Sequence, residues 1–145
     1  MALFASIKCE GLEIVLAEDV INSYDYSYKL DDVYAKTNPE SIKMMLELDV
    51  NEILSGESNS LEENKELLEN LREWGKDIFS EPGDQYYRRV TLTHTFGNEL
   101  FKEIELSHAY LENFIEDVNL ERGRHTIKIE LVQKRDKLFR QKVNS

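Results

Sequence analysis

The feature that most constrains this chain is a strict alternation of apolar and polar residues. In residues 41–54, SIKMMLELDVNEIL, the alternating apolar residues are Ile42, Met44, Leu46, Leu48 and Val50. Met45 is the one apolar residue on the opposite, polar side. Because successive side chains of an extended strand point to opposite faces, the segment predicts a strand with one buried and one wet face.

The same alternation recurs along the chain. Residues 86–96, YYRRVTLTHTF, are followed by Gly97-Asn98 and then by LFKEIEL, which predicts a β-hairpin whose buried face includes Val90, Leu92, His94 and Phe96. Residues 125–134, HTIKIELVQK, predict another strand after a turn at Gly123. Near the start, IKCEGLEIVL and NSYDYSYKL also have strand character, and the latter carries a row of tyrosines that we expect to pack on a sheet face.

One segment has helical spacing instead. Residues 60–74, SLEENKELLENLREW, begin with an S-x-x-E capping box at Ser60 and Glu63, and Gly75 can end the helix. Its apolar stripe consists of Leu61, Leu67, Leu68, Leu71 and Trp74. The fold class is therefore mainly β (α+β): a compact antiparallel β-barrel or sandwich with one amphipathic helix packed on its side.

The low content of chain-breaking residues argues against a domain boundary. The sequence has two prolines, six glycines, no internal repeat and no low-complexity linker. A chain of 145 residues also suits one core. We expect a single domain over residues 1–145, with a helix-containing insertion at about 55–81.

Residues 104–117, IELSHAYLENFIED, separate two classes of protein. As a helix, they would stack His108, Glu112 and Glu116 on one face, as a metal site or acid/base pair requires. The stretch follows a hairpin arm and precedes a glycine turn, which favours a strand. On a strand, Tyr110, Glu112, Phe114 and Glu116 would share one side, and His108 would lie along the strand axis from both glutamates.

Motifs of catalysis are absent from the sequence. It contains no GxxxxGK[ST], GxGxxG, HExxH, GxSxG or EF-hand spacing, and its three histidines do not recur at metal-ligand spacing. The single cysteine, Cys9, excludes an internal disulfide and is expected to be a small core residue of a first strand. We expect no catalytic, metal-binding or cofactor-binding residues, and hence a protein that is not an enzyme.

Charge is distributed unevenly. The net charge is −11, but residues 121–145 carry eight basic and three acidic residues, a balance of +5, which leaves −16 for the first 120. The strong negative charge of the first 120 residues argues against nucleic-acid binding. Because the C-terminal residues carry the opposite charge, the chain could associate head to tail with further copies of itself. The start lacks a secretory signal and no apolar run is long enough to span a bilayer, so we expect folding in the cytoplasm and no membrane insertion.

The stretch from Trp74 to Lys137 resembles the tube-forming proteins of contractile injection systems, which include the haemolysin-coregulated proteins of type VI secretion and relatives in phage tail-like particles. The resemblance is carried by the hairpin with YRRV at its entry, by HAYLENFIED, by the turn at Gly123 and by a final strand ending in Gln133-Lys134. The early strand INSYDYSYKLDD, followed by a loop and the long strand at 42–50, also fits.

The resemblance implies a structural inner-tube subunit. Such subunits form hexameric rings that stack into a hollow tube, which is expelled when a sheath contracts. It implies sheath, baseplate and spike proteins as partners, effector proteins as cargo in the lumen, no cofactor, and release or injection with the particle. It places contacts between rings in the loop KLDDVYAKTNPE, at Asp31, Asp32, Val33, Tyr34 and Lys36.

The charge asymmetry adds a second set of interface candidates. We expect the basic residues Lys134, Arg135, Lys137 and Arg140 to meet acids of a neighbouring subunit. Two other interpretations stay open: a small acidic binding or immunity protein that neutralises a basic partner, and an enzyme or metal-binding barrel of cupin type.

Overall fold

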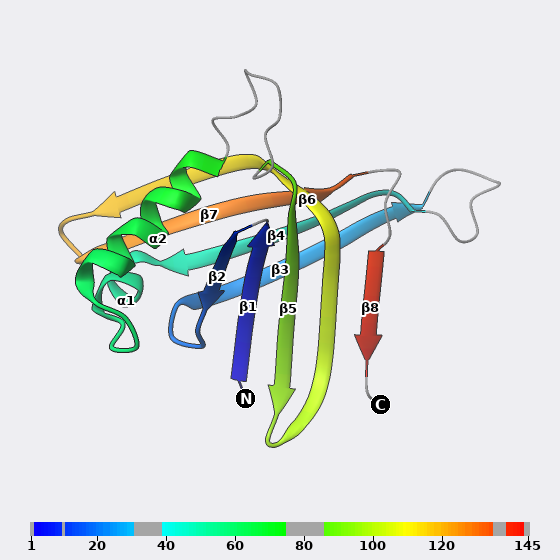
Figure 1. Cartoon of the computed structure of the whole chain (residues 1–145), viewed down its shortest axis with the longest axis horizontal. Coiled ribbons are helices and arrows are strands. Elements are labelled where there is room, and N and C mark those ends of the chain that lie inside the picture. The colour runs from blue at the N-terminus through cyan, green and yellow to red at the C-terminus, as the bar shows by residue number, and fades with distance from the viewer. Residues whose placement is uncertain (1, 10, 31–38, 75–85, 135–138, 144–145) are drawn as a thin grey trace.

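The structure, a computed structural model, describes residues 2–9, 11–30, 39–74, 86–134 and 139–143. These residues form eight strands and two helices (Figure 1). In chain order the elements are β1 (Ala2–Cys9), β2 (Leu12–Leu16), β3 (Ile21–Leu30), β4 (Pro39–Asp49), α1 (Val50–Ser55), α2 (Leu61–Trp74), β5 (Arg88–Phe96), β6 (Glu99–Asn119), β7 (Arg124–Gln133) and β8 (Phe139–Val143).

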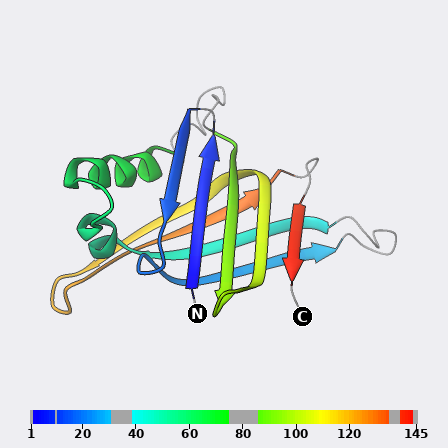
Figure 2. The same ribbon diagram turned by 60° about the horizontal axis from the view of Figure 1, so that its bottom comes forward.

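The strands form one antiparallel sheet that folds over on itself. Its order is β2-β1-β5-β6-β7-β4-β3, and β8 pairs with β6 off this path. The 21-residue strand β6 belongs to both halves, because it pairs with β5 and β8 before Ala109 and with β7 after it. In Figure 2 the strands of the first half cross those of the second, so the sheet makes a two-layered sandwich with β6 as the shared corner.

The predicted alternation produces the core between these layers. The inward residues of β4 and β7 are buried on one side, and those of β1, β5 and the first half of β6 are buried on the other. They include Ile7, Leu46, Leu92, Ile104 and Ile129, each at most 1% exposed. Tyr24 and Tyr26 pack against this core, as expected for these two members of the tyrosine row. The mainly-β fold class is confirmed.

The strand predicted at 42–50 ends one residue early, at Asp49, and a helix follows it. The Asp49 carboxylate accepts a hydrogen bond from the amide of Glu52 (3.2 Å) and so caps a second, unexpected helix, α1. Val50 and Ile53 of α1 are buried at helical spacing. The alternation continued by chance to Val50, because that residue suits the core in either conformation.

The first predicted strand, IKCEGLEIVL, is two strands instead of one. Gly11 has a φ of 77°, a left-handed conformation that turns β1 back on β2. Cys9 pairs with Leu12 across this turn and is half-buried. The prediction that Phe96 faces the core is also wrong. Phe96 is the last residue of β5, next to the β5–β6 turn, and is 68% exposed.

The predicted capping box starts α2. The amide of Glu63 donates to the Ser60 hydroxyl (3.2 Å), and the Ser60 amide donates to the Glu63 carboxylate (3.4 Å). Leu68, Leu71 and Trp74 are buried as predicted, whereas Leu61 in the first turn is exposed. Gly75, the predicted helix stop, lies outside the described residues.

Candidate self-assembly surfaces

Helix α2 is held on the β6–β7 hairpin by a charged network. The Arg72 guanidinium donates two hydrogen bonds to the Glu116 carboxylate, from Nε (3.1 Å) and from Nη2 (2.8 Å). His125 Nε2 lies 2.5 Å from the same carboxylate. The bonds from Arg72, together with the contact from His125, hold the pKa of Glu116 below its usual range. These contacts therefore fix the β6–β7 hairpin in its position against α2.

The turn at the end of this hairpin is also fixed. The Asn51 side chain on α1 donates to the carbonyl of Gly123 (3.1 Å), and the Asn119 side chain accepts from the amide of Arg122 (3.0 Å). The braced turn presents Leu120, which is 89% exposed. Ile115 and Val118, earlier on the same hairpin, are exposed as well. We call the end of the hairpin that carries Ile115, Val118 and Leu120, with Ile115 and Val118 on opposite faces of β6, the hairpin-tip surface.

A second group of exposed apolar residues lies at the other end of β6. Phe96 and Phe101 flank the β5–β6 turn, and Phe4 on β1 is opposite Thr93 in the neighbouring strand. We call Phe4, Phe96 and Phe101 the phenylalanine surface. Exposed apolar residues at both ends of β6 are available for contacts with other chains through two different regions.

Near the β5–β6 turn, polar and aromatic side chains of β3 contact side chains of β5 and β6 between the two layers. The Tyr24 hydroxyl lies 2.9 Å from His94 Nδ1, and the Lys102 ammonium lies 4.0 Å from the centroid of the Tyr26 ring. His94 therefore has the structural role that is usual for a lone strand histidine. The alternation had placed it on the inner face, and it does lie partly inside.

The three residues that a helix would have grouped, His108, Glu112 and Glu116, lie apart on the strand β6. Glu112 pairs with Lys43 across the sheet (3.4 Å), Glu116 bonds Arg72, and His108 Nδ1 lies 3.1 Å from the Ser107 hydroxyl. Within the part of the chain that the structure describes, no three His, Cys, Asp or Glu side chains are grouped as a metal site needs.

One detail of that strand was predicted wrongly. A shift in register between Leu111 and Asn113 breaks the alternation, so Leu111 and Phe114 lie opposite the buried residues Leu131 and Ile129. Glu112 and Phe114 therefore do not share one regular face. Such a bulge adds a residue to one strand and sharpens its bend, which suits the corner position of β6.

The predicted interface residues fall mostly outside the described part of the chain. This holds for Asp31, Asp32, Val33, Tyr34 and Lys36 and for Arg135 and Lys137. Lys134 is described: its amide donates to the carbonyl of His108 (2.8 Å), and its ammonium lies 5.0 Å from the Tyr87 ring centroid. In β8 the register places Arg140 opposite Glu105 of the same chain.

Two buried polar residues that organise this region were missed by the sequence analysis. Asn64 on α2 donates to the carbonyls of Leu54 (3.2 Å) and Gly56 (3.0 Å), which joins the two helices. Arg88 is 1% exposed, donates to the Asn70 side chain (2.7 Å) and stacks on Trp74 (4.5 Å). The position of Asn64 in the apolar stripe between Leu61 and Leu68 could have indicated a buried polar residue. The contacts of Arg88 could not have been predicted, because they join segments that are far apart in the sequence.

Cys9 has no feature of a nucleophile. Burial raises the pKa of its thiol, and the nearby Arg88 charge offsets this only in part. A thiol with a raised pKa carries little thiolate at neutral pH. Neither α1 nor α2 is long and apolar enough to cross a membrane.

No protein-family model matches the sequence, and no curated protein does. Solved structures do. A sheath/tube terminator structure of an extracellular contractile injection system, PVC, matches with a TM-score of 0.57 and 16% identity over 97% of this chain and 93% of the other. The chain has the fold of the tube components of contractile injection systems.

Other structures of such machines are similar. The PVC sheath-tube complex in its extended state matches with a TM-score of 0.55 and 16% identity over 98% of this chain and 88% of the other. The Hcp1 protein of the E. coli EAEC 042 pathovar matches with a TM-score of 0.53 and 6% identity over 99% of both chains. At these identities the likeness establishes the fold, and over nearly the full length of each neighbour.

Proposed function

We propose that this chain is an inner-tube subunit of a contractile injection system. It forms hexameric rings, and the rings stack into a hollow tube that is expelled when a surrounding sheath contracts. The observation that carries the proposal is the likeness to tube components over nearly the whole chain, with no large part of either chain left over. The two exposed apolar surfaces at opposite ends of β6 support it, because a heterologous contact between unlike surfaces builds rings and filaments.

The proposal assigns assembly to the cytoplasm and a non-enzymatic role. The partners are further copies of the chain, then sheath, baseplate and spike proteins, with effector proteins as cargo of the lumen. The tube leaves the cell as part of the particle. The loop at Asp31, Asp32, Val33, Tyr34 and Lys36 supplies contacts between rings, and the whole chain of residues 1–145 acts as one domain.

Negative-stain electron microscopy of the purified full-length protein tests this function. We expect rings or tubes with a central hole. A protein that stays monomeric at high concentration and captures a basic protein tightly would overturn the proposal in favour of an acidic binding protein.

The basic C-terminal residues provide a sharper test. We expect the double variant Arg135→Glu/Lys137→Glu to abolish long tubes, because it replaces attraction to the acidic body of the next subunit by repulsion. Tube length in micrographs is the measurement. The double variant Lys8→Glu/Lys65→Glu makes the same charge change at exposed residues of β1 and α2 and should leave tube length unchanged. Normal tubes of the first variant would contradict the role of the basic residues.

A further inference from the structure

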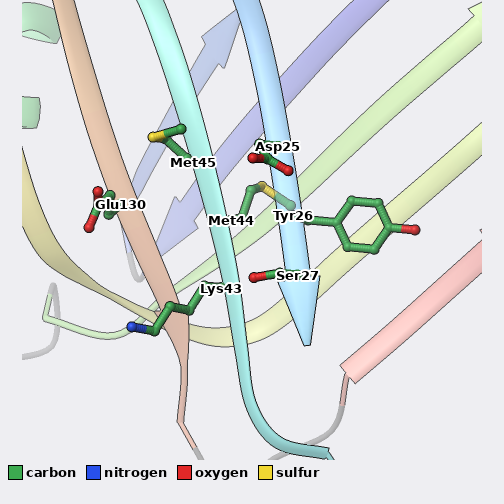
Figure 3. A pocket seen from close by; sticks show the side chains of 7 residues that line it. All are labelled: Asp25, Tyr26, Ser27, Lys43, Met44, Met45 and Glu130. Carbon is green, nitrogen blue, oxygen red and sulfur yellow. The ribbon is translucent and has the colours of Figure 1, made fainter. Parts of the chain in front are cut away.

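A hollow lies on the outer face of the layer formed by β3, β4 and β7. Its volume is about 280 Å³, and Asp25, Met45 and Glu130 contribute to its lining. The register makes these three residues one cross-strand row, because Asp25 is opposite Met45 and Met45 is opposite Glu130. Figure 3 shows Met45 in the middle of the row, with Asp25 on the β3 side and Glu130 on the β7 side.

Met45 is the residue that broke the alternation of β4. The face around it is otherwise polar, with Ser23 and Ser27 on β3 and Lys43 and Glu47 on β4. A half-buried methionine here adds nothing to the core on the other side of the sheet. Its flexible, polarisable side chain is suited to contact the aliphatic part of a ligand.

The uncompensated charge of the hollow is negative. Lys43, which also lines it, is paired with Glu112 (3.4 Å), and Glu47 accepts a hydrogen bond from Ser23 (3.5 Å). Asp25 and Glu130 form no ion pair or hydrogen bond with any residue that the structure describes. Because β4 separates their strands, the two backbones are about 10 Å apart, and a cation held over Met45 lies within reach of both carboxylates.

We propose that this hollow binds a lysine or arginine side chain of a separate, cationic polypeptide. The aliphatic stem lies along Met45, and the charged end lies between Asp25 and Glu130. A second copy of the chain is the less suitable occupant, because its net charge is −11 and only its residues 121–145 are basic. The inference rests on the proposed function only for identifying the polypeptide as cargo of the tube, since the isolated subunit already presents the hollow.

Methionine-methyl NMR of the full-length protein tests the binding. The probe is a synthetic peptide of repeated Lys-Ser-Gly, and its counterpart has glutamine in place of lysine. We expect the Met45 methyl signal to shift saturably with the lysine peptide only. Met44 also lines the hollow, but its side chain is 1% exposed in the core, so its methyl signal should shift less than that of Met45.

Charge-neutralising variants locate the site. Asp25→Asn/Glu130→Gln should weaken peptide binding at least fivefold, whereas Glu18→Gln/Asp19→Asn removes the same two charges from an exposed turn and should change it less than twofold. Equal weakening by both pairs would overturn the proposal, as would an unmoved Met45 signal. A Met45 shift that follows protein concentration without peptide would assign the hollow to a second copy and overturn the proposed occupant. Binding by a protein that forms no tubes would leave the inference standing and contradict only the tube function.

Discussion

Asn64 shows how much a single buried amide contributes to this fold. It occupies a position in the apolar stripe of α2, yet its two hydrogen bonds satisfy the Leu54 and Gly56 carbonyls at the end of α1. A helix end leaves such carbonyls without partners inside the helix. The apolar pattern therefore located the buried face of α2 correctly but did not reveal why a polar residue belongs there.

Replacement of Asn64 should destabilise the protein measurably. We expect Asn64→Ala to lower the free energy of unfolding by about 1–3 kcal/mol, because it removes two hydrogen bonds of a buried amide, each of which contributes about 0.5–1.5 kcal/mol. Urea unfolding followed by circular dichroism measures this. Asn59→Ala, at an exposed position just before the helix, should stay within about 0.5 kcal/mol of the wild type. Equal stability of both variants would show that the Asn64 bonds do not stabilise the helix pair.

At the scale of elements, the contact between α2 and the β6–β7 hairpin should depend on pH through Glu116. Arg72 lowers the pKa of Glu116 in the folded protein below the ordinary value of 4.5. A lowered folded pKa contributes stability that is fully present above the unfolded pKa and is lost as pH falls through the folded one. The free energy of unfolding of the wild type should therefore be higher than that of Glu116→Gln by on the order of 1 kcal/mol at pH 7. The difference should vanish in acid.

Unfolding free energies measured against pH for both proteins test this expectation. The matched control is Glu66→Gln on the exposed side of the same helix, which should equal the wild type at pH 7. A difference between wild type and Glu116→Gln that persists below the lowered pKa would mean that packing of the side chain, and not its charge, stabilises the hairpin.

At the scale of the whole molecule, assembly should be separable from folding at the hairpin tip. Leu120 is 89% exposed, so Leu120→Asp should change the free energy of unfolding by no more than about 0.5 kcal/mol. The same change places a charge in the hairpin-tip surface and should reduce assembly, measured by sedimentation velocity and micrographs. Leu61→Asp alters another exposed leucine, at the start of α2, and should assemble normally. Unreduced assembly of Leu120→Asp would exclude the tip as a contact.

The sequence by itself determined the elements whose burial is local and periodic. Alternation identified β4, β5, β7 and their inward residues except Phe96, and the Ser60–Glu63 box located the start of α2, because both signals depend on neighbours a few residues away. It also separated His108 from Glu112 and Glu116, since a strand places residues that are four apart in sequence about 13 Å apart along its axis.

Only the tertiary structure decided where these elements change direction and what they contact. The apolar pattern continued the strand beyond Asp49, but Asp49 caps the helix α1 instead. The helix is stabilised by the burial of Val50 and Ile53 in the core, which the local pattern does not show. The register shift after Leu111, the bonds from Arg72 to Glu116 and the row of Asp25, Met45 and Glu130 join residues from different strands or helices. Their proximity depends on pairing between segments far apart in the chain, which no local pattern encodes.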